Sequence, residues 1–244
     1  MIRAFQVSYD GTGYAGLQVQ ENARTIQGVI EQSLERVLKQ RTRISYAGRT
    51  DAGVHALGQV IAFESQSSMT GQQLKHALNA LIPQDIRILN PLEVDADTDF
   101  HPRYNAGARW YRYIMWNGRE PVPFFRNYAL RLDRKVDILR LRSYGKRIVG
   151  EHNFTSFASL VQDENPVRNV FSCEVHRKND FVILDLVANA FLRKMVRSIV
   201  GTFLHLEQRG ERPECIDEIL KAEHRGEAGA TAYAGGLYLA KVFY

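Results

Sequence analysis

The amino-acid sequence predicts an α+β protein in which helices pack on sheets. Apolar and polar residues alternate over residues 2–9, which is typical of a strand. Apolar residues then recur at helical spacing from residue 26 to residue 38, which predicts an amphipathic helix packed on a sheet. Both halves of the chain contain this mixture, and 244 residues are enough for one large domain or two ordinary ones. We expect two similar lobes, residues 1–104 and 105–244, around a cleft.

The first half is predicted to alternate between strands and helices. Its expected elements are a strand at 2–9, a helix from an N-cap near Thr25, strands on both sides of residue 51, a helix at 71–81 that Pro83 ends, and a short strand at 86–89. A turn-rich segment at 91–105 follows, and Asp95, Asp97 and Asp99 make it acidic. This segment is the expected boundary between the halves.

The second half repeats the mixture of strands and helices. Its expected elements are a strand at 106–116, a helix at 136–149, a hairpin at 170–187 that turns at Asn179-Asp180, a helix after Ala190, a short helix at 213–222, and a strand at 237–243. The helix after Ala190 has one broad apolar face that must be buried. Arg193 and Arg197 are four residues apart on the border of that face, where a long side chain can direct its charge into an adjoining cleft.

Composition indicates an ordinary globular protein, with 45% hydrophobic and 24% charged residues. No apolar stretch approaches the roughly 20 residues of a membrane span, and the first residues run directly into a strand pattern. The two cysteines, Cys173 and Cys215, are far apart and lack a Cys-x-x-Cys spacing. These features predict a cytoplasmic protein without a membrane partner.

A net charge of +5 permits a polyanionic partner, and the distribution of the charges favours one. Basic residues form three groups: Arg41, Arg43 and Arg49; Arg103, Arg109 and Arg112; and Arg193, Lys194 and Arg197. The middle group is interleaved with the aromatic residues Tyr104, Trp110, Tyr111 and Tyr113. Charge mixed with stacking surface is typical of proteins that bind single-stranded RNA, although each group alone is also compatible with a solvated face.

Residues 48–55 (GRTDAGVH) are the most informative segment, because they present one carboxylate beside one guanidinium in a glycine-bracketed loop. Arg49 can keep Asp51 ionised, and an ionised carboxylate can act as a nucleophile or a general base. On composition alone, Asp51 could instead cap a turn with Arg49 as its surface partner. A metal site with His55 or His101 is not expected, because no spacing supports a third ligand.

The segment 48–55 resembles the catalytic loop of the pseudouridine synthases of the tRNA type A family, in which the aspartate of this string is essential. Residues 9–18 (YDGTGYAGLQ) resemble the family's N-terminal signature, with Leu17 where the family usually carries Trp. Residues 108–113 (ARWYRY) resemble the motif whose first tyrosine lies against the target base, here Tyr111. Residues 189–201 (NAFLRKMVRSIVG) and 236–239 (GLYL) resemble the motifs that supply an arginine partner for the aspartate, Arg197, and a pocket leucine, Leu237.

The resemblance implies an isomerase that converts uridine to pseudouridine at positions 38, 39 and 40 of the tRNA anticodon arm. It implies the pseudouridine synthase fold, with a central, largely antiparallel sheet flanked by helices and the active site between the lobes. It also implies a homodimer that needs no cofactor. In this reading Arg49 fills the space that the target base leaves. The expected substrate-binding residues are Tyr111, Leu237, Arg193, Lys194 and Arg109.

Two other classes of protein stay open at this point. One is a non-catalytic RNA-binding protein, which would function without the carboxylate of Asp51. The other is a metal-dependent phosphodiesterase that uses Asp51, His55 and a distant acid, and it would cleave RNA and lose activity to a chelator. The sequence also leaves open whether Asp51 attacks C1′ of the ribose, attacks C6 of the uracil, or removes a sugar proton.

Overall fold

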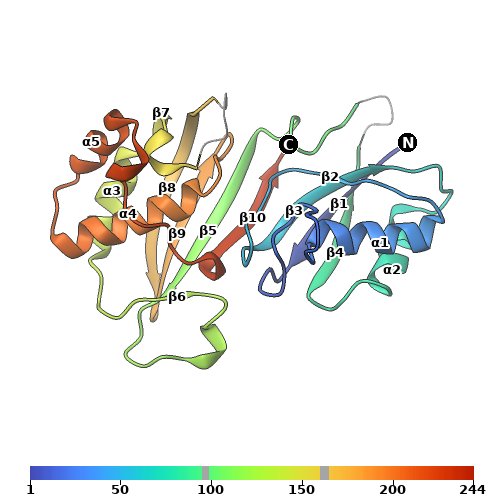
Figure 1. Cartoon of the computed structure of the whole chain (residues 1–244), viewed down its shortest axis with the longest axis horizontal. Coiled ribbons are helices and arrows are strands. Elements are labelled where there is room, and N and C mark those ends of the chain that lie inside the picture. Colours follow the sequence, from blue (N-terminus) through green and yellow to red (C-terminus); the bar gives the residue numbers. More distant parts are fainter. Residues whose placement is uncertain (95–98, 160–164) are drawn as a thin grey trace. The chain divides into compact units, whose positions relative to one another are not determined.

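A computed structural model describes residues 1–94, 99–159 and 165–244, and this part of the chain forms two compact units (Figure 1). Unit 1 contains Met1–Gly107 and Tyr238–Tyr244, and unit 2 contains Ala108–Leu237. The last strand thus belongs to unit 1 although it closes the second half of the sequence. Two acidic residues of the predicted turn-rich segment, Asp95 and Asp97, lie outside the described residues.

Unit 1 is a sheet with two helices packed side by side (Figure 1). Its elements are β1 (Ile2–Tyr9), α1 (Ile26–Leu38), β2 (Ser45–Tyr46), β3 (His55–Glu64), α2 (Gly71–Asn79), β4 (Ile86–Leu92) and most of β10 (Leu237–Phe243). The strand order is β4-β1-β3-β10, and β2 also pairs with β3. All these pairs are antiparallel except β3 with β10, which is parallel.

The helices of unit 1 begin where the sequence provides caps. The side chain of Thr25 accepts a hydrogen bond from the amide of Gly28, and Thr70 forms a capping box with Gln73. One apolar face of α1, one of α2 and the inner face of β1 are buried. These core residues include Phe5, Val7, Ile30, Leu34, Leu74 and Leu78.

Unit 2 contains further strands and, within the described residues, three α-helices (Figure 1). Its elements are β5 (Ala108–Trp116), η1 (Pro123–Phe125), β6 (Leu130–Arg131), α3 (Ile138–Arg147), β7 (Gly150–Asn153), η2 (Thr155–Phe157), β8 (Val167–Lys178), β9 (Phe181–Ala188), α4 (Met195–Arg209), α5 (Cys215–Ala222), η3 (Arg225–Glu227) and η4 (Ala234–Gly236). The strand order is β5-β9-β8-β7, all antiparallel, and β6 pairs in parallel with β5.

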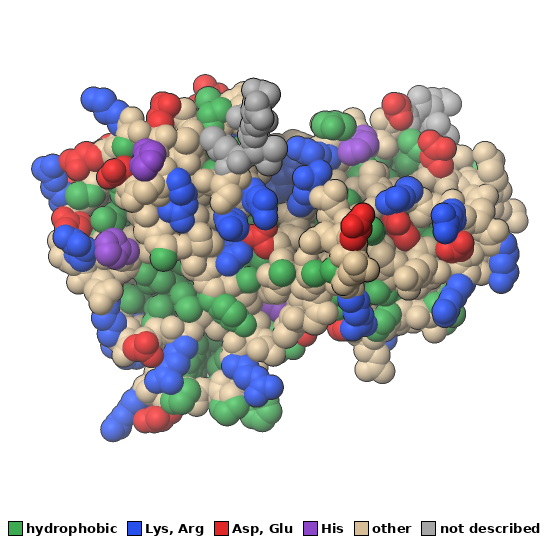
Figure 2. Space-filling model, viewed as in Figure 1, with side chains coloured by type: hydrophobic (Ala, Val, Ile, Leu, Met, Phe, Trp, Pro, Cys, Tyr) green, Lys and Arg blue, Asp and Glu red, His purple; other side chains and the backbone are tan. Residues whose placement is uncertain are grey.

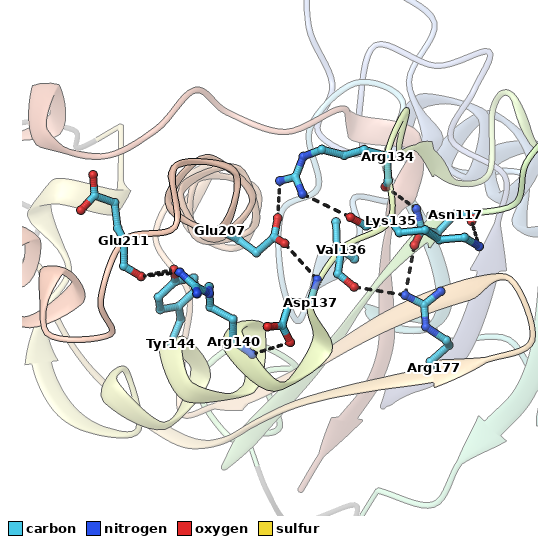
Figure 3. A network of polar contacts seen from close by, with 10 residues as sticks. All are labelled: Asn117, Arg134, Lys135, Val136, Asp137, Arg140, Tyr144, Arg177, Glu207 and Glu211. Atoms are coloured by element: carbon cyan, nitrogen blue, oxygen red, sulfur yellow. Dashed lines mark hydrogen bonds and ion pairs between the residues drawn. The ribbon is translucent and has the colours of Figure 1, made fainter.

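A polar network fixes the chain that connects β6 to α3 (Figure 3). The carboxylate of Glu207, on α4, pairs with the guanidinium of Arg134 and accepts a 2.9 Å hydrogen bond from the amide of Asp137. Asp137 in turn caps α3. Burial alone would raise the pKa of Glu207, but the hydrogen bonds from Arg134 and Asp137 outweigh it and lower the pKa. The network therefore fastens α4 to the start of α3.

The predicted α+β class with largely antiparallel strands is confirmed, and so are both hairpin strands and the position of their turn at Asn179, which has a left-handed φ of 54°. One helix boundary was wrong. The helix expected directly after Ala190 begins at Met195, because Lys194 has a left-handed φ of 64°. Arg193 is therefore not on the helix with Arg197. None of the helices in the described ranges is long and apolar enough to cross a membrane.

Candidate functional site

Asp51 lies on the loop between β2 and β3 of unit 1, and hydrogen bonds hold the loop near both ends. The side-chain amide of Gln59 donates to the carbonyl of Gly48 at 2.7 Å and accepts from the amide of Gly48 at 3.3 Å. The amide of Val54 donates to the carbonyl of Asp51 at 3.1 Å. The side chain of Asp51 is half-buried, and Arg49 is exposed. The loop thus presents a carboxylate from a fixed backbone.

The N-terminal segment 9–18 packs directly against this loop. A Cβ atom on Gly11 would lie 2.0 Å from the carbonyl oxygen of Val54, and one on Gly16, where φ is +104°, would lie 2.8 Å from the carbonyl oxygen of Thr50. The amide of Leu17 donates to that same carbonyl at 3.1 Å. Only glycine permits main chains to approach this closely. The segment therefore supports the Asp51 loop from behind, and Leu17 is a fully buried core residue.

His55 connects three parts of unit 1. Its Nδ1 lies 3.1 Å from the amide of Gly11, from which it accepts when the ring is neutral, and 3.2 Å from a carboxylate oxygen of Asp10. Its ring stacks on Tyr238 of β10, with centroids 4.8 Å apart. This buried histidine thus joins the N-terminal segment, the Asp51 loop and the last strand. Across the described ranges, no three His, Cys, Asp or Glu side chains are grouped so that they could hold a metal ion.

Strand β5 of unit 2 separates the middle group of basic and aromatic residues onto two faces. Arg112 forms a bidentate ion pair with Asp185, at 2.8 and 2.9 Å, and the indole of Trp110 donates to the same carboxylate at 2.7 Å. Tyr111 and Tyr113 are buried on the other face. Because side chains alternate along a strand, residues that are neighbours in the sequence do not form one surface here.

Tyr111 and Arg109 both contact the segment that leads into α4. The ring of Tyr111 meets Phe191 edge to face, with centroids 4.9 Å apart. Arg109 is buried and donates a 2.6 Å hydrogen bond to the carbonyl of Asn189. Arg109 therefore has a structural contact in addition to the predicted substrate contact. Arg193 is exposed and Lys194 half-buried, and both lie on this segment just before α4.

Arg197, on the third residue of α4, is held by residues 229–232. Its Nε donates to the carbonyl of Ala232 at 2.8 Å, and the amide of Ala232 donates back to the carbonyl of Arg197 at 3.0 Å. This contact depends on Gly201, because a Cβ atom there would lie 1.8 Å from the carbonyl oxygen of Ala230. The helix and the segment therefore fix the direction of the Arg197 side chain together.

Leu237 follows two glycines, Gly235 and Gly236, and the second packs against β5. A Cβ atom on Gly236 would lie 2.8 Å from both the ring of Tyr113 and the carbonyl oxygen of Ile114. Only glycine therefore lets the chain pass this close to β5. The hydroxyl of Tyr113 donates to the carbonyl of Tyr233 at 2.6 Å. Burial is the main reason that the pKa of Tyr113 is raised. Tyr111, Arg197 and Leu237 are thus carried by elements that pack together in unit 2.

The sequence did not single out the residues that brace the loop in unit 1. The hydroxyl of Tyr9 and that of Thr50 lie 2.8 Å apart, and burial raises the pKa of Tyr9 to about 12 against the opposing hydrogen bonds of Thr50 and Gln59. Gln59 is completely buried. The sequence did contain a signal for Gln59, because a side-chain amide among the apolar residues of a buried strand requires hydrogen-bond partners.

The total charge does not locate an RNA-binding surface. On the face drawn in Figure 2, Lys and Arg side chains lie beside Asp and Glu side chains in many places. Several basic residues from the predicted groups have acidic partners; Arg112 pairs with Asp185, for example. The basic residues relevant to RNA must therefore be identified by their surroundings.

Comparisons with known proteins agree with the motifs. A family model described as tRNA pseudouridine synthase matches residues 6–105 and 146–244. The tRNA pseudouridine synthase A of Pseudothermotoga lettingae is 41% identical over 96% of this chain and 95% of its own. The enzymes of the same name from Thermotoga maritima and Borrelia hermsii are 39% and 38% identical, each over 98% of this chain and 97% of their own.

These matches and the α+β fold define a pseudouridine synthase. The chain belongs to the tRNA pseudouridine synthase family, in agreement with the resemblance found in its sequence. It is an isomerase that acts on tRNA.

Proposed function

We propose that this enzyme converts the uridines at positions 38, 39 and 40 of the tRNA anticodon stem-loop to pseudouridine, with Asp51 as the catalytic carboxylate. The observation that carries the proposal is the support of the Asp51 loop. Gln59 and the segment 9–18 fix its backbone, while the Asp51 side chain keeps part of its surface exposed. A carboxylate on a preorganised loop is suited to act on a substrate rather than on its own fold.

The reaction is an isomerisation, so the atoms of substrate and product are the same. The bond from C1′ of the ribose to N1 of uracil breaks, the uracil turns, and C1′ bonds to C5. The proton on C5 leaves, and N1 carries a proton in the product. Attack on C1′, attack on C6 and removal of a sugar proton all require an ionised carboxylate, so each is compatible with Asp51.

The other predicted residues receive roles that match their chemistry. Arg197 is the proposed cationic partner of Asp51, which favours the ionised form of the carboxylate. Tyr111 and Leu237 are the proposed walls of the uracil pocket, where exclusion of water prevents loss of the freed base. Arg49 is proposed to fill the space of the extruded base.

The remaining proposals concern the surroundings of the site. Arg193 and Lys194 are proposed to contact the RNA backbone, as is Arg109. A homodimer that binds tRNA in the cytoplasm is the proposed working form, by resemblance to the family. Its mass in solution with and without tRNA tests the dimer directly.

The test is to incubate the purified protein with unmodified tRNA in EDTA and to map pseudouridine by carbodiimide-dependent primer extension. We expect stops at positions 38 to 40 with the wild type and none with Asp51→Asn, which keeps the shape of the side chain but removes its charge. A tRNA with cytidine at the three positions is the substrate control. Stops elsewhere in the tRNA would refute the site assignment, and an active Asp51→Asn variant would refute the role of the carboxylate.

A further inference from the structure

Unit 1 contains a basin of about 480 Å³ beside the Asp51 loop. Arg49 forms part of its wall, and Asp51 does not. The wall also contains Arg43, Tyr46 and the turn that carries His101, Arg103 and Tyr104. The volume lies within the range of about 300 to 1,000 Å³ that is usual for small-molecule sites. None of these residues except Arg49 has a role in the proposed chemistry.

The charge of the basin is positive. Three arginines line it, and Glu21 is the acidic residue in its wall. Arg43 is 80% exposed, and its contact with Glu31 is long, at 4.0 Å. Because the contact is at the limit of an ion pair and the Arg43 side chain itself is exposed, the pair is worth little, and Arg43 can turn to another anion at low cost. The basin therefore suits a ligand with negative charge.

Tyr104 adds an exposed aromatic surface that is held in place. Its side chain is 77% exposed although a tyrosine ring gains from burial. The turn beneath it is fixed, because the amide of His101 donates to the side chain of Asn105 at 2.8 Å and the amide of Arg103 donates to Nδ1 of His101 at 3.1 Å. The ring of His101 lies 4.5 Å from that of Tyr104. An ordered, exposed ring among arginines is the usual platform for a nucleic-acid base.

We propose that this basin binds a nucleotide of the tRNA other than the target uridine, with its base stacked on Tyr104 and its phosphates near Arg43 and Arg103. The inference rests on the proposed function, since Arg49 borders both the basin and the Asp51 loop. A strand that delivers its uridine to Asp51 would pass Arg49 and place a neighbouring nucleotide in the basin. Binding there would orient the RNA without taking part in the chemistry.

The test is equilibrium binding of unmodified tRNA to the full-length protein, measured by filter binding over a range of salt concentrations. Loss of one base stack weakens binding by about 5- to 150-fold, so Tyr104→Ala should fall in this range. Tyr104→Phe keeps the ring and should bind within about twofold of the wild type. Changing Arg43 and Arg103 together to Gln should reduce the slope of log affinity against log salt by about 1 to 2.

Two variants serve as matched controls. Phe124→Ala removes an exposed aromatic ring of unit 2, and Arg36→Gln removes an exposed arginine of unit 1 outside the basin. Both should bind tRNA like the wild type. Equal losses in Phe124→Ala and Tyr104→Ala would overturn the proposal, because affinity would not then depend on the basin.

Pseudouridine formation by the wild type separates this proposal from the proposed function. If the wild type modifies positions 38 to 40 and Tyr104→Ala binds and modifies tRNA equally well, the basin is not a nucleotide site and the proposed function stands. If the wild type does not modify these positions but Tyr104→Ala weakens tRNA binding while Tyr104→Phe does not, the basin proposal stands and the site assignment fails.

Discussion

A single methyl group at Gly11 should lower the activity of the enzyme about 100-fold without touching a side chain of the proposed active site. The Cβ atom of Gly11→Ala would lie 2.0 Å from the carbonyl oxygen of Val54, whereas contacts under 3.0 Å essentially never occur. The loop must therefore move by about 1 Å, the difference between these distances. Since the amide of Val54 bonds to the carbonyl of Asp51, the movement reaches the carboxylate. A displacement of about 1 Å can cost about 10²-fold in rate.

Gly13 provides the matched control, because a Cβ atom there meets no atom within 4 Å. We expect Gly13→Ala to keep the wild-type rate of pseudouridine formation. Gly11→Ala should fall about 100-fold in kcat/KM and lose about 1 to 3 kcal/mol of stability from overpacking. Initial rates with tRNA and thermal unfolding separate the two effects. A folded Gly11→Ala protein with kcat/KM within threefold of the wild type would refute the argument that this glycine sets the position of the loop.

Three further predictions concern unit 2. Glu207→Gln should cost about 1.5 to 3 kcal/mol, because charged hydrogen bonds to a buried carboxylate are lost, while the exposed control Glu218→Gln should change stability little. The pKa of Glu207 in the folded protein is lowered from 4.5, so the stability that its carboxylate contributes is complete above pH 4.5 and is lost as the pH falls through the folded pKa. Urea unfolding at several pH values should therefore show the stabilities of the wild type and Glu207→Gln converging in acid. Tyr113→Phe should lower stability by about 1 to 3 kcal/mol, since a backbone carbonyl loses its donor, and thermal unfolding measures it. Desolvation of the thiol, with the nearby carboxylates of Asp185 and Glu174, raises the pKa of Cys173 to about 12, so Ellman's reagent at pH 8 should label Cys215 well before Cys173, and equal rates would contradict the raised pKa.

Local patterns in the sequence were enough to predict most elements, because caps and periodicity act over a few residues. Thr25 begins α1 as expected, and the strand predicted at residues 2–9 has those same limits in β1. The start of α4 was wrong for a physical reason. Residues 191 and 192 continue the apolar pattern of the helix, but Lys194 takes a left-handed conformation that no periodicity reveals. Apolar spacing predicts burial more reliably than it predicts backbone conformation.

Long-range contacts account for what the sequence could not predict. The pairing of β10 with β3 joins residues such as Tyr238 and His55, and nothing local to either strand indicates it. Trp110 and Tyr113, which the sequence placed in one group, lie on opposite faces of β5, and Tyr104 belongs to a turn of unit 1. The roles of Asp51, Arg197 and Tyr111 stay predictions that rest on the family's motifs.

The glycines of these motifs explain why the motifs extend well beyond the residues with proposed chemical roles. Gly11 and Gly16 let the N-terminal segment touch the backbone of the Asp51 loop, and Gly201 and Gly236 let two segments of unit 2 cross a helix and a strand. In each case a Cβ atom would meet a main-chain carbonyl, which cannot turn aside as a side chain can. The residues with proposed chemical roles are thus positioned by backbone-to-backbone contacts. A change at one of these glycines should affect catalysis through position, whereas a change at Asp51 should affect it through charge.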